Sequence, residues 1–258
     1  MDYASKNREA WNNEVENNNY WTKIVDESAI LDAKAGNISI TVTPSKPIPT
    51  SWIEELKGKR VLNLAGGGGQ QTPLLAAWGA DVTTIDISDS QLMQDKKALE
   101  AYGLNAELIQ GNMTRIPFDN NCFDGVINPQ SLNFIEDIES VFKEVHRVLK
   151  SGGIYIFGLA NPILYIFDEK VQEKKLKIKY TLPFSDTISL SKKELDKRLQ
   201  KKDTIEFSHT LDSIIGGLLN AGFVLEGFFS DKALSEPTDS FIYDSHLAFK
   251  ARKIVSQI

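Results

Sequence analysis

Between residues 59 and 159, short apolar runs alternate with segments that have the 3.6-residue spacing of amphipathic helices. The first run, residues 60–65, is followed by four consecutive glycines and then by a helix signal. In this signal Thr72 is expected as the N-cap, Pro73 as the first helical residue and Gly79 as the stop. The pattern therefore predicts a buried strand, a glycine loop and a helix in this order.

The alternation continues along the following part of the chain. Apolar runs predict four further strands, over residues 81–87, 106–110, 122–128 and 153–159. Helices are expected over residues 88–103, where Ser88 and Gln91 have the spacing of a capping box, and over residues 135–149, before the sequence KSGG. Strands that alternate with helices or crossovers predict an α/β fold with a doubly wound, Rossmann-like and mostly parallel sheet.

The two flanking regions break this alternation. Residues 1–58 hold three of the four tryptophans and end in a proline-rich segment, so we expect an aromatic lead-in that caps the domain over 59–258. Residues 160–205 form a lid-like insertion, which we expect over the carboxyl ends of the strands, where open α/β sheets bind ligands. Residues 209–223 then predict a helix, and two final strands complete a seven-stranded sheet with an antiparallel edge pair.

Composition narrows the class of protein. The 258 residues, 41% of them hydrophobic, suffice for one sizeable core, and the single cysteine, Cys122, rules out an intramolecular disulfide. No signal peptide and no apolar stretch of about 18 residues is visible, which predicts a cytoplasmic protein without a membrane partner. The pattern leaves both a monomer and a homodimer open.

Charge is distributed unevenly along the chain. The net charge of −6 argues against a general nucleic-acid binder, yet residues 169–203 contain eleven Lys or Arg and six Asp or Glu. This tract is either a solvated helical insertion or a lid that meets an anionic substrate. The three histidines and one cysteine lack ligand spacing, so we expect no metal.

The glycine loop indicates a ligand that closely approaches the backbone beside a helix N-terminus. The dinucleotide fingerprint G-x-G-x-x-G is incomplete, because its third glycine is replaced by Gln71 or Thr72, depending on the register. Asp86 ends the second strand, where a carboxylate can accept both hydroxyl groups of a ribose, although a helix cap is an alternative role. After the third strand, Asn112 and Met113 offer a polar and an apolar side chain for a purine.

With these elements in this order, residues 59–159 resemble the class I S-adenosylmethionine-dependent methyltransferases, especially the small-molecule branch similar to quinone-biosynthesis methyltransferases. The segment FKEVHRVLKSGGIYIF is similar to the family's RVLKPGG helix end and fifth strand, with Ser151 where proline is common. The resemblance implies S-adenosylmethionine as the cofactor. The residues that it implies for cofactor binding are Asn63, Ala65, Gly66, Gly67, Gly69, Asp86, Ile87, Asn112, Met113, Asn128 and Gln130.

Several positions depart from the family's pattern. Asn63 replaces the usual acid and Ala65 the first glycine, so capture of the cofactor's ammonium group would depend on backbone carbonyls. Asn112 replaces an aspartate and can still offer an amide oxygen or nitrogen to adenine. Pro129 is followed by Gln130 instead of a second proline, so the sequence does not support methylation of exocyclic amines of DNA or of protein glutamine.

Methyl transfer by in-line displacement needs alignment more than a dedicated catalytic motif. An oxygen or nitrogen nucleophile can still need a general base, and His209 is the candidate, with a helix-entry histidine bonded to backbone as the alternative. His146 and His246 are assigned structural roles.

We therefore predict methyl transfer to an O, N or C nucleophile of a small molecule, in a pocket closed by the insertion and by Tyr20 and Trp21. Two alternatives stay open. The basic insertion would suit a tRNA or rRNA methyltransferase, and the changes at Asn63 and Ala65 would suit a non-catalytic S-adenosylmethionine-binding protein.

Overall fold

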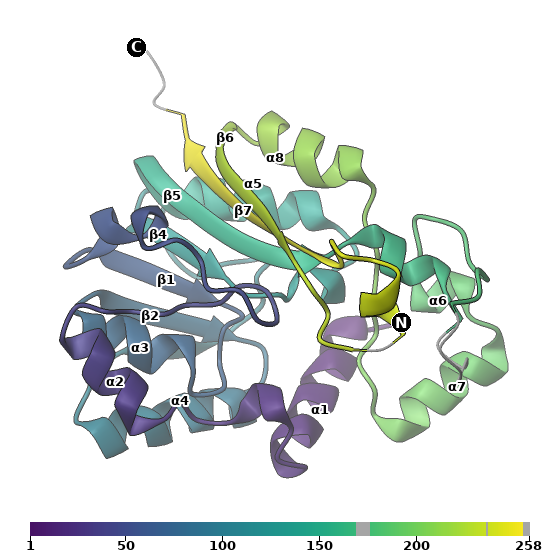
Figure 1. Ribbon diagram of the computed structural model, residues 1–258, viewed down its shortest axis with the longest axis horizontal. Coiled ribbons are helices and arrows are strands. Elements are labelled where there is room, and N and C mark those ends of the chain that lie inside the picture. Colours follow the sequence, from purple (N-terminus) through teal and green to yellow (C-terminus); the bar gives the residue numbers. More distant parts are fainter. Residues whose placement is uncertain (169–175, 236, 255–258) are drawn as a thin grey trace.

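The computed structural model describes residues 1–168, 176–235 and 237–254 and contains one mixed β-sheet (Figure 1). Its seven strands lie in the order β3-β2-β1-β4-β5-β7-β6. Their bounds are β1 Arg60–Leu64, β2 Asp81–Asp86, β3 Glu107–Gln110, β4 Phe123–Asn128, β5 Leu149–Ala160, β6 Phe223–Asp231 and β7 His246–Lys253. The first five strands are mutually parallel and β7 is antiparallel to both neighbours, which confirms the predicted sheet.

Helices cover both faces of the sheet (Figure 1). The longer ones are α1 Tyr3–Glu16, α2 Glu27–Lys34, α3 Gln71–Trp78, α4 Asp89–Tyr102, α5 Ile138–Val148 and α7 Lys192–Lys201, with the short α6 Asp186–Ser189 and α8 Gly217–Asn220. Seven further single turns are η1 Tyr20–Thr22, η2 Thr50–Trp52, η3 Glu54–Leu56, η4 Leu132–Phe134, η5 Pro162–Ile166, η6 Asp212–Gly216 and η7 Thr238–Ser240.

Alternate residues of the central strands feed two apolar cores. Leu62 and Leu64 of β1 pack with buried residues of α5 and of the segment around α8. Val61, the residue before Leu62, packs with residues of α2 and α3 on the other face. This follows from the two-residue period of a strand, whose successive side chains point to opposite faces. The continuous apolar runs of the sequence correspond to strands that are buried on both faces.

Several predicted helix boundaries are confirmed and others are wrong. The Ser88 side chain caps α4 by accepting the Gln91 N–H at 3.1 Å, and Gly79 ends α3 with a φ of 103°. Thr72 is not an N-cap, because α3 begins at Gln71. The Thr72 hydroxyl is drawn instead into a buried network below the glycine loop, where it donates to Asp95 Oδ2 at 3.0 Å.

The helix expected over residues 135–149 begins only at Ile138, because the Asp137 carboxylate caps it by accepting the Ser140 N–H at 3.1 Å. The sequence KSGG lies inside β5, which starts at Leu149, so it does not end the helix by itself. The helix expected over residues 209–223 is a π-helical turn followed by α8.

The N-terminal segment packs tightly on the sheet. The Val42 carbonyl oxygen lies so close to β5 that a Cβ at Gly158 would be 1.8 Å from it. The Asn7 amide of α1 donates to the Ile205 carbonyl oxygen at 3.0 Å, at the end of the 160–205 insertion, whose helices α6 and α7 lie on the right-hand side of Figure 1. Residues 169–175 of this insertion, and so part of its basic tract, lie outside the described residues.

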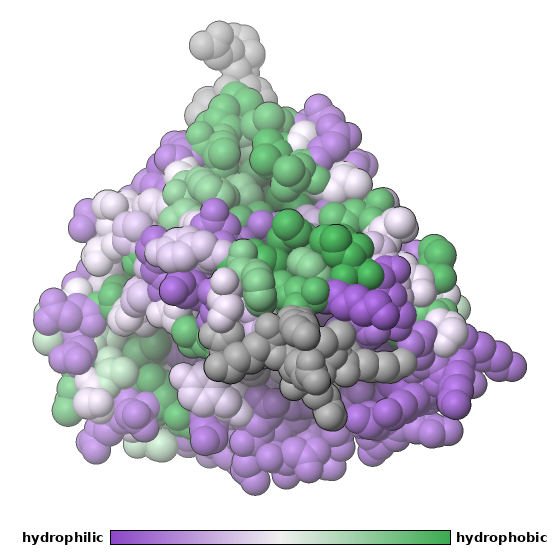
Figure 2. Space-filling model, turned by 45° about the vertical axis from the view of Figure 1, so that its right-hand side comes forward, coloured by the Kyte–Doolittle hydropathy of each residue, from purple (hydrophilic) through white to green (hydrophobic). Residues whose placement is uncertain are grey.

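The described basic residues of the insertion gather on α7. None of the residues of this helix is buried, and the lower part of the face in Figure 2 is correspondingly hydrophilic, whereas hydrophobic residues gather above it. In the part of the chain that the structure describes, no helix combines the length and the apolar composition needed to cross a bilayer.

Candidate functional site

A cavity of about 410 Å³ lies at the carboxyl ends of the parallel strands. This volume is typical of pockets for small molecules and cofactors. Its walls come from the loops that follow β1, β2, β3 and β4, together with the N-terminal segment. Of the residues that the sequence nominates for a cofactor, those that line the cavity are Ala65, Gly66, Gly67, Asp86, Ile87, Asn112, Met113 and Gln130.

The three remaining nominated residues, Asn63, Gly69 and Asn128, do not line this cavity. The buried Asn63 amide donates to the Gly66 carbonyl oxygen at 2.8 Å. The Gly69 N–H donates to Asp95 Oδ1 at 2.7 Å. The Asn128 amide donates to the carbonyl oxygen of Leu64 at 2.6 Å. These three hydrogen bonds fix the two ends of the glycine loop that follows β1.

Asp86 lies at the end of β2 and is almost fully buried. Its Oδ2 accepts the Gly67 N–H at 3.0 Å and its Oδ1 accepts the Ser88 N–H at 2.9 Å. Burial raises the pKa of Asp86 to about 6, although the backbone N–H groups of Ser88, Gly67 and Ile87 oppose this effect. The carboxylate is therefore ionised at neutral pH, at a cost in stability.

The glycine loop leaves little room for side chains. A Cβ at Gly67 would lie 3.0 Å from Asp86 Oδ2, and Ala65 adopts a φ of 50°, in the left-handed region. Below the loop, burial raises the pKa of Asp95 to about 8, while its bonds from Gly69 and Thr72 oppose this shift. The neutral form of Asp95 is therefore favoured near pH 7.

Asn112 follows β3 and its side chain is partly engaged. Its Oδ1 accepts the Thr114 N–H at 2.9 Å and the Thr114 hydroxyl at 3.0 Å. The amide nitrogen is therefore the group that Asn112 can offer to a ligand. Met113, its neighbour in the cavity wall, adds an apolar surface.

Helix α1 supplies one wall that sequence reasoning missed. Its cavity-lining side chains include Tyr3, Asn7, Trp11 and Glu14, which share one helix face through their spacing of three and four residues. This periodicity was visible in the sequence. Trp21 also lines the cavity as expected, but Tyr20 does not and is 68% exposed.

The described side chains that can give this cavity a charge near neutral pH are carboxylates, so its charge is negative. Its lining residues include the carboxylates of Glu14 and Asp86, whereas no Lys or Arg occurs among the described residues that line it. The described lysines of the 160–205 insertion line neither this cavity nor a smaller cavity that adjoins it. Within the described residues, no cluster of His, Cys, Asp and Glu could hold a metal ion.

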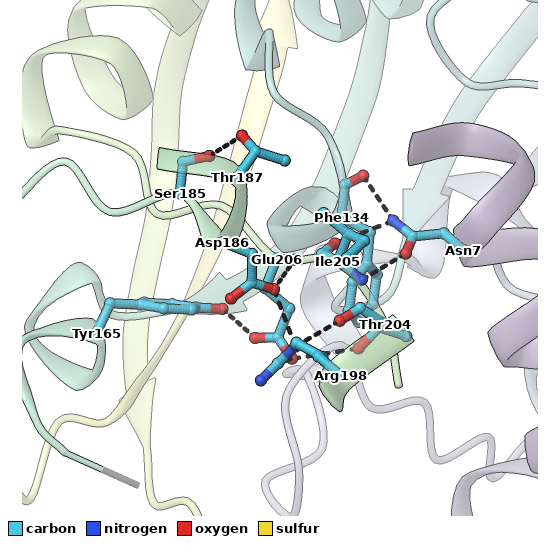
Figure 3. Close-up of polar contacts among 10 residues, drawn as sticks. All are labelled: Asn7, Phe134, Tyr165, Ser185, Asp186, Thr187, Arg198, Thr204, Ile205 and Glu206. Carbon is cyan, nitrogen blue, oxygen red and sulfur yellow. Dashed lines mark hydrogen bonds and ion pairs between the residues drawn. The ribbon is translucent and has the colours of Figure 1, made fainter. Parts of the chain in front are cut away.

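A second cavity of about 280 Å³ adjoins the first and shares Gln130, Phe134 and His246 with it. Its other walls come mainly from the insertion. Its aromatic lining residues are Phe134, Tyr165, Phe167, Tyr180 and Phe184. Figure 3 shows the polar network at one side of this cavity, where the Tyr165 hydroxyl points toward Glu206.

The histidines do not lie as the sequence suggests. The structure does not bring His209 to either cavity; His209 is buried, with Nε2 3.0 Å from the Leu132 carbonyl oxygen, and burial lowers its pKa. His246, assigned a structural role from the sequence, lines both cavities. Burial lowers the pKa of His246 to about 4, although the charge of Asp231 opposes this shift.

Comparisons with known proteins show the family to which the chain belongs. A family model described as "Methyltransferase domain" matches residues 62–157. The chain is 40% identical to "Uncharacterized methyltransferase YbaJ" of Bacillus subtilis, over 95% of this chain and 94% of that protein. It is also 33% identical to "Ubiquinone/menaquinone biosynthesis C-methyltransferase UbiE" of Enterobacter, over 42% of this chain and 45% of that protein.

Solved structures share the fold at low identity. An S-adenosylmethionine-dependent methyltransferase from Mesorhizobium loti has a TM-score of 0.63 and 21% identity, covering 79% of this chain and 95% of its own. The 1,6-didemethyltoxoflavin-N1-methyltransferase of Burkholderia thailandensis, solved with 1,6-didemethyltoxoflavin and S-adenosylhomocysteine, has a TM-score of 0.60 and 14% identity. This similarity covers 98% of this chain and 89% of the Burkholderia protein.

Proposed function

Because the chain belongs to the class I S-adenosylmethionine-dependent methyltransferases, we propose that it binds S-adenosylmethionine in the larger cavity and methylates a small molecule. The observation that carries this proposal is the convergence of three loop ends on one cavity. Gly66 and Gly67 follow β1, Asp86 ends β2, and Asn112 follows β3.

The chemistry of the lining residues fits this cofactor. S-adenosylmethionine carries a sulfonium and an ammonium group against one carboxylate, so it is a net cation. A cavity with the carboxylates of Glu14 and Asp86, and without Lys or Arg among its described lining residues, favours such a ligand. The rings of Trp11 and Trp21 add faces that attract cations.

We assign one part of the cofactor to each loop. Asp86 would accept the ribose hydroxyls, and Asn112 and Met113 would contact the adenine, the former through its amide nitrogen. The backbone of Gly66 and Gly67 would lie along the methionine part. Asn63, Gly69 and Asn128 would then support the loop from behind, as their bonds to backbone atoms suggest.

When bound, S-adenosylmethionine supplies an electrophilic methyl group for in-line displacement by the acceptor's nucleophile. The protein's part is to align the two ligands and to exclude water. The 1–58 lead-in and the 160–205 insertion would perform this second task, because Trp21 lines the larger cavity and the insertion supplies most of the smaller one. Two adjoining cavities are consistent with a ternary complex like that of the Burkholderia enzyme, which was solved with both 1,6-didemethyltoxoflavin and S-adenosylhomocysteine.

Calorimetric titration tests cofactor binding directly. We expect S-adenosylmethionine and S-adenosylhomocysteine to bind with micromolar affinity, Asp86→Ala to lose this binding, and Asp89→Ala, three residues further on at an exposed site, to retain it. NAD is the negative control. Equal binding of S-adenosylhomocysteine to the wild type and Asp86→Ala would refute the assignment.

The acceptor class needs a separate assay. After incubation with radiolabelled S-adenosylmethionine and either a filtered metabolite extract or total tRNA, we expect label in the small-molecule fraction. Label in tRNA alone would instead support the nucleic-acid alternative.

A further inference from the structure

The smaller cavity is largely aromatic. Tyr165 and Phe184 lie with ring centroids 5.5 Å apart, and Tyr180 contacts Phe184 edge-on with centroids 5.0 Å apart. Phe134 and Phe167 complete the set of rings that line it. Such walls stabilise a flat π-system by stacked and edge-to-face contacts, which a puckered aliphatic ring cannot make equally well.

The polar side chains on the insertion side of this cavity bind one another. The Tyr165 hydroxyl donates to Glu206 Oε2 at 2.8 Å and accepts from the Asn133 amide at 2.8 Å. Glu206 Oε1 also accepts from Arg198 at 3.0 Å, and Arg198 in turn forms an ion pair with Asp186 (Figure 3). These groups therefore bind one another and stabilise this wall of the cavity.

The wall shared by the two cavities is different. Among the described residues, neither the side-chain amide of Gln130 nor Nε2 of His246 has a hydrogen-bond partner. Both residues line both cavities. A polar atom of a ligand in the smaller cavity would therefore find its partners at this wall, next to the cofactor cavity.

The contacts of His246 indicate its tautomer. The Ser245 hydroxyl donates its only proton to the Asp231 carbonyl oxygen at 3.3 Å. His246 Nδ1, at 3.2 Å, is the other possible acceptor of this proton. Because we assign the proton to the carbonyl oxygen, the hydroxyl accepts from Nδ1, and Nδ1 carries the hydrogen. Nε2 is left unprotonated and can accept a proton.

On the premise of the proposed function, we propose that the smaller cavity binds a planar aromatic or heteroaromatic acceptor whose nucleophile is a ring-borne O–H or N–H group. The ring lies among the aromatic side chains and the nucleophile points toward the shared wall. His246 Nε2 accepts the nucleophile's proton, and Gln130 orients the same group.

The step balances without a further reactant. A lone pair of the acceptor's oxygen or nitrogen forms the new bond to the methyl carbon, and the carbon–sulfur bond breaks with its electron pair on sulfur. The acceptor's proton passes to His246 Nε2 and then to solvent. Because the pKa of His246 is about 4, its imidazole is neutral at physiological pH but is a weak base. Nε2 therefore takes the proton as the bond to the methyl carbon forms, when the acceptor's O–H or N–H group becomes strongly acidic.

The test uses 2-naphthol as the planar probe and decahydro-2-naphthol as its puckered control. Both are titrated into the full-length protein saturated with S-adenosylhomocysteine, and 2-naphthol is then assayed as a methyl acceptor with radiolabelled S-adenosylmethionine. We expect 2-naphthol to bind at least about tenfold more tightly than its control and to be methylated.

Two substitutions fill the cavity from different segments, Leu164→Trp and Leu190→Trp, and both should weaken 2-naphthol binding at least about tenfold. Ile163→Trp, at the adjacent residue that lies outside the cavity lining and is 39% exposed, is the matched control and should bind normally. Binding of S-adenosylhomocysteine reports that each variant is folded.

His246→Asn keeps a polar group near Ser245 but removes Nε2. We expect about a hundredfold lower kcat with unchanged binding of 2-naphthol, whereas His146→Asn, outside both cavities, should match the wild type. An unchanged kcat in His246→Asn overturns the role of His246.

The acceptor assignment is overturned if the wild type does not bind or methylate 2-naphthol. It is also overturned if Leu164→Trp and Leu190→Trp bind 2-naphthol as tightly as the wild type does. A protein that binds S-adenosylhomocysteine but not 2-naphthol counts against this inference alone. A folded protein that binds neither counts against the proposed function.

Discussion

Replacing Asp86 by asparagine should separate the stability of the protein from its affinity for the cofactor. The change keeps the size of the side chain and removes its charge. The Asp86 carboxylate is almost fully buried, and its two oxygens accept the N–H groups of Gly67 and Ser88. Asparagine can accept only through its single oxygen, so one of these donors loses its partner.

The magnitude follows from the pKa of Asp86, which burial raises from 3.8 to about 6. The native state then binds the proton more tightly than the unfolded chain, so the free energy of unfolding decreases as pH rises from about 4 to about 6, by about 3 kcal/mol in all. The Asp86→Asn variant lacks this loss. One unpaired N–H costs about 1–2 kcal/mol. At pH 8 the free energy of unfolding of the variant should therefore be about 1–2 kcal/mol above that of the wild type.

Cofactor affinity should change in the opposite direction. If the ionised carboxylate accepts the ribose hydroxyls, affinity for S-adenosylhomocysteine in the wild type falls up to about tenfold for each pH unit below about 6 and is constant above pH 7. The variant should bind about 10- to 100-fold more weakly at pH 8, since a hydrogen bond to a charged group contributes about 1.5–3 kcal/mol. Its affinity should not depend on Asp86 ionisation.

The assay combines urea unfolding with calorimetric titration of S-adenosylhomocysteine at pH 5, 6, 7 and 8. Asp89→Asn, at the exposed first residue of α4, serves as the matched control and should follow the wild type in cofactor binding at each pH. The reasoning is refuted if Asp86→Asn binds S-adenosylhomocysteine as tightly as the wild type at pH 8, or if both proteins show the same pH dependence of affinity.

Three further substitutions probe the supports of the site, each measured by urea unfolding. Asn63→Asp replaces the donor to the Gly66 carbonyl oxygen by a buried carboxylate, which should lower the free energy of unfolding by about 3 kcal/mol at pH 8. The loss should be smaller at pH 5, where protonation of the carboxylate restores a donor. An equal loss at both pH values would contradict this reasoning. Arg198→Ala breaks two largely buried ion pairs and should cost about 3 kcal/mol, with S-adenosylhomocysteine affinity retained; loss of that affinity would show that the insertion also supports the larger cavity. Gly158→Ala drives a Cβ into the Val42 carbonyl oxygen and should cost about 3 kcal/mol or more, whereas a neutral effect would mean that the lead-in is not tightly seated.

Local sequence patterns were sufficient for the strands and for α3, α4 and α5, because both depend on the period of buried positions. Helices α1, α2 and α7, which lie in the two flanking regions, were not predicted. They failed where a tertiary contact decides a local outcome. Thr72 has the chemistry of an N-cap, yet its hydroxyl donates to the buried Asp95 carboxyl, and α3 begins at Gln71, two residues before the expected Pro73. The Asp137 cap was equally visible in the sequence but competes with an apolar period that runs through it.

The position of His246 at the cavities, and of His209 outside them, has a topological reason. β7 runs antiparallel to β5, and its first residue, His246, pairs with Ala160 at the carboxyl end of β5. The beginning of an antiparallel strand thus meets the same sheet edge as the ends of the parallel strands. The sequence predicted this antiparallel strand, so the signal for His246 was present. His209 precedes a helix and turns toward the Leu132 carbonyl oxygen, a contact that no local pattern indicates.

The two cavities draw on different parts of the chain, and this limits what family membership conveys. The glycine loop, Asp86, Asn112 and Met113 all fall within the matched residues 62–157. Of the residues that line the smaller cavity, only Gln130, Asn133 and Phe134 fall within that range. The rest come from the 160–205 insertion, from Glu206 and from the start of β7. The matched region therefore contains the residues that we assign to the cofactor, while the shape of the proposed acceptor site depends on residues beyond it.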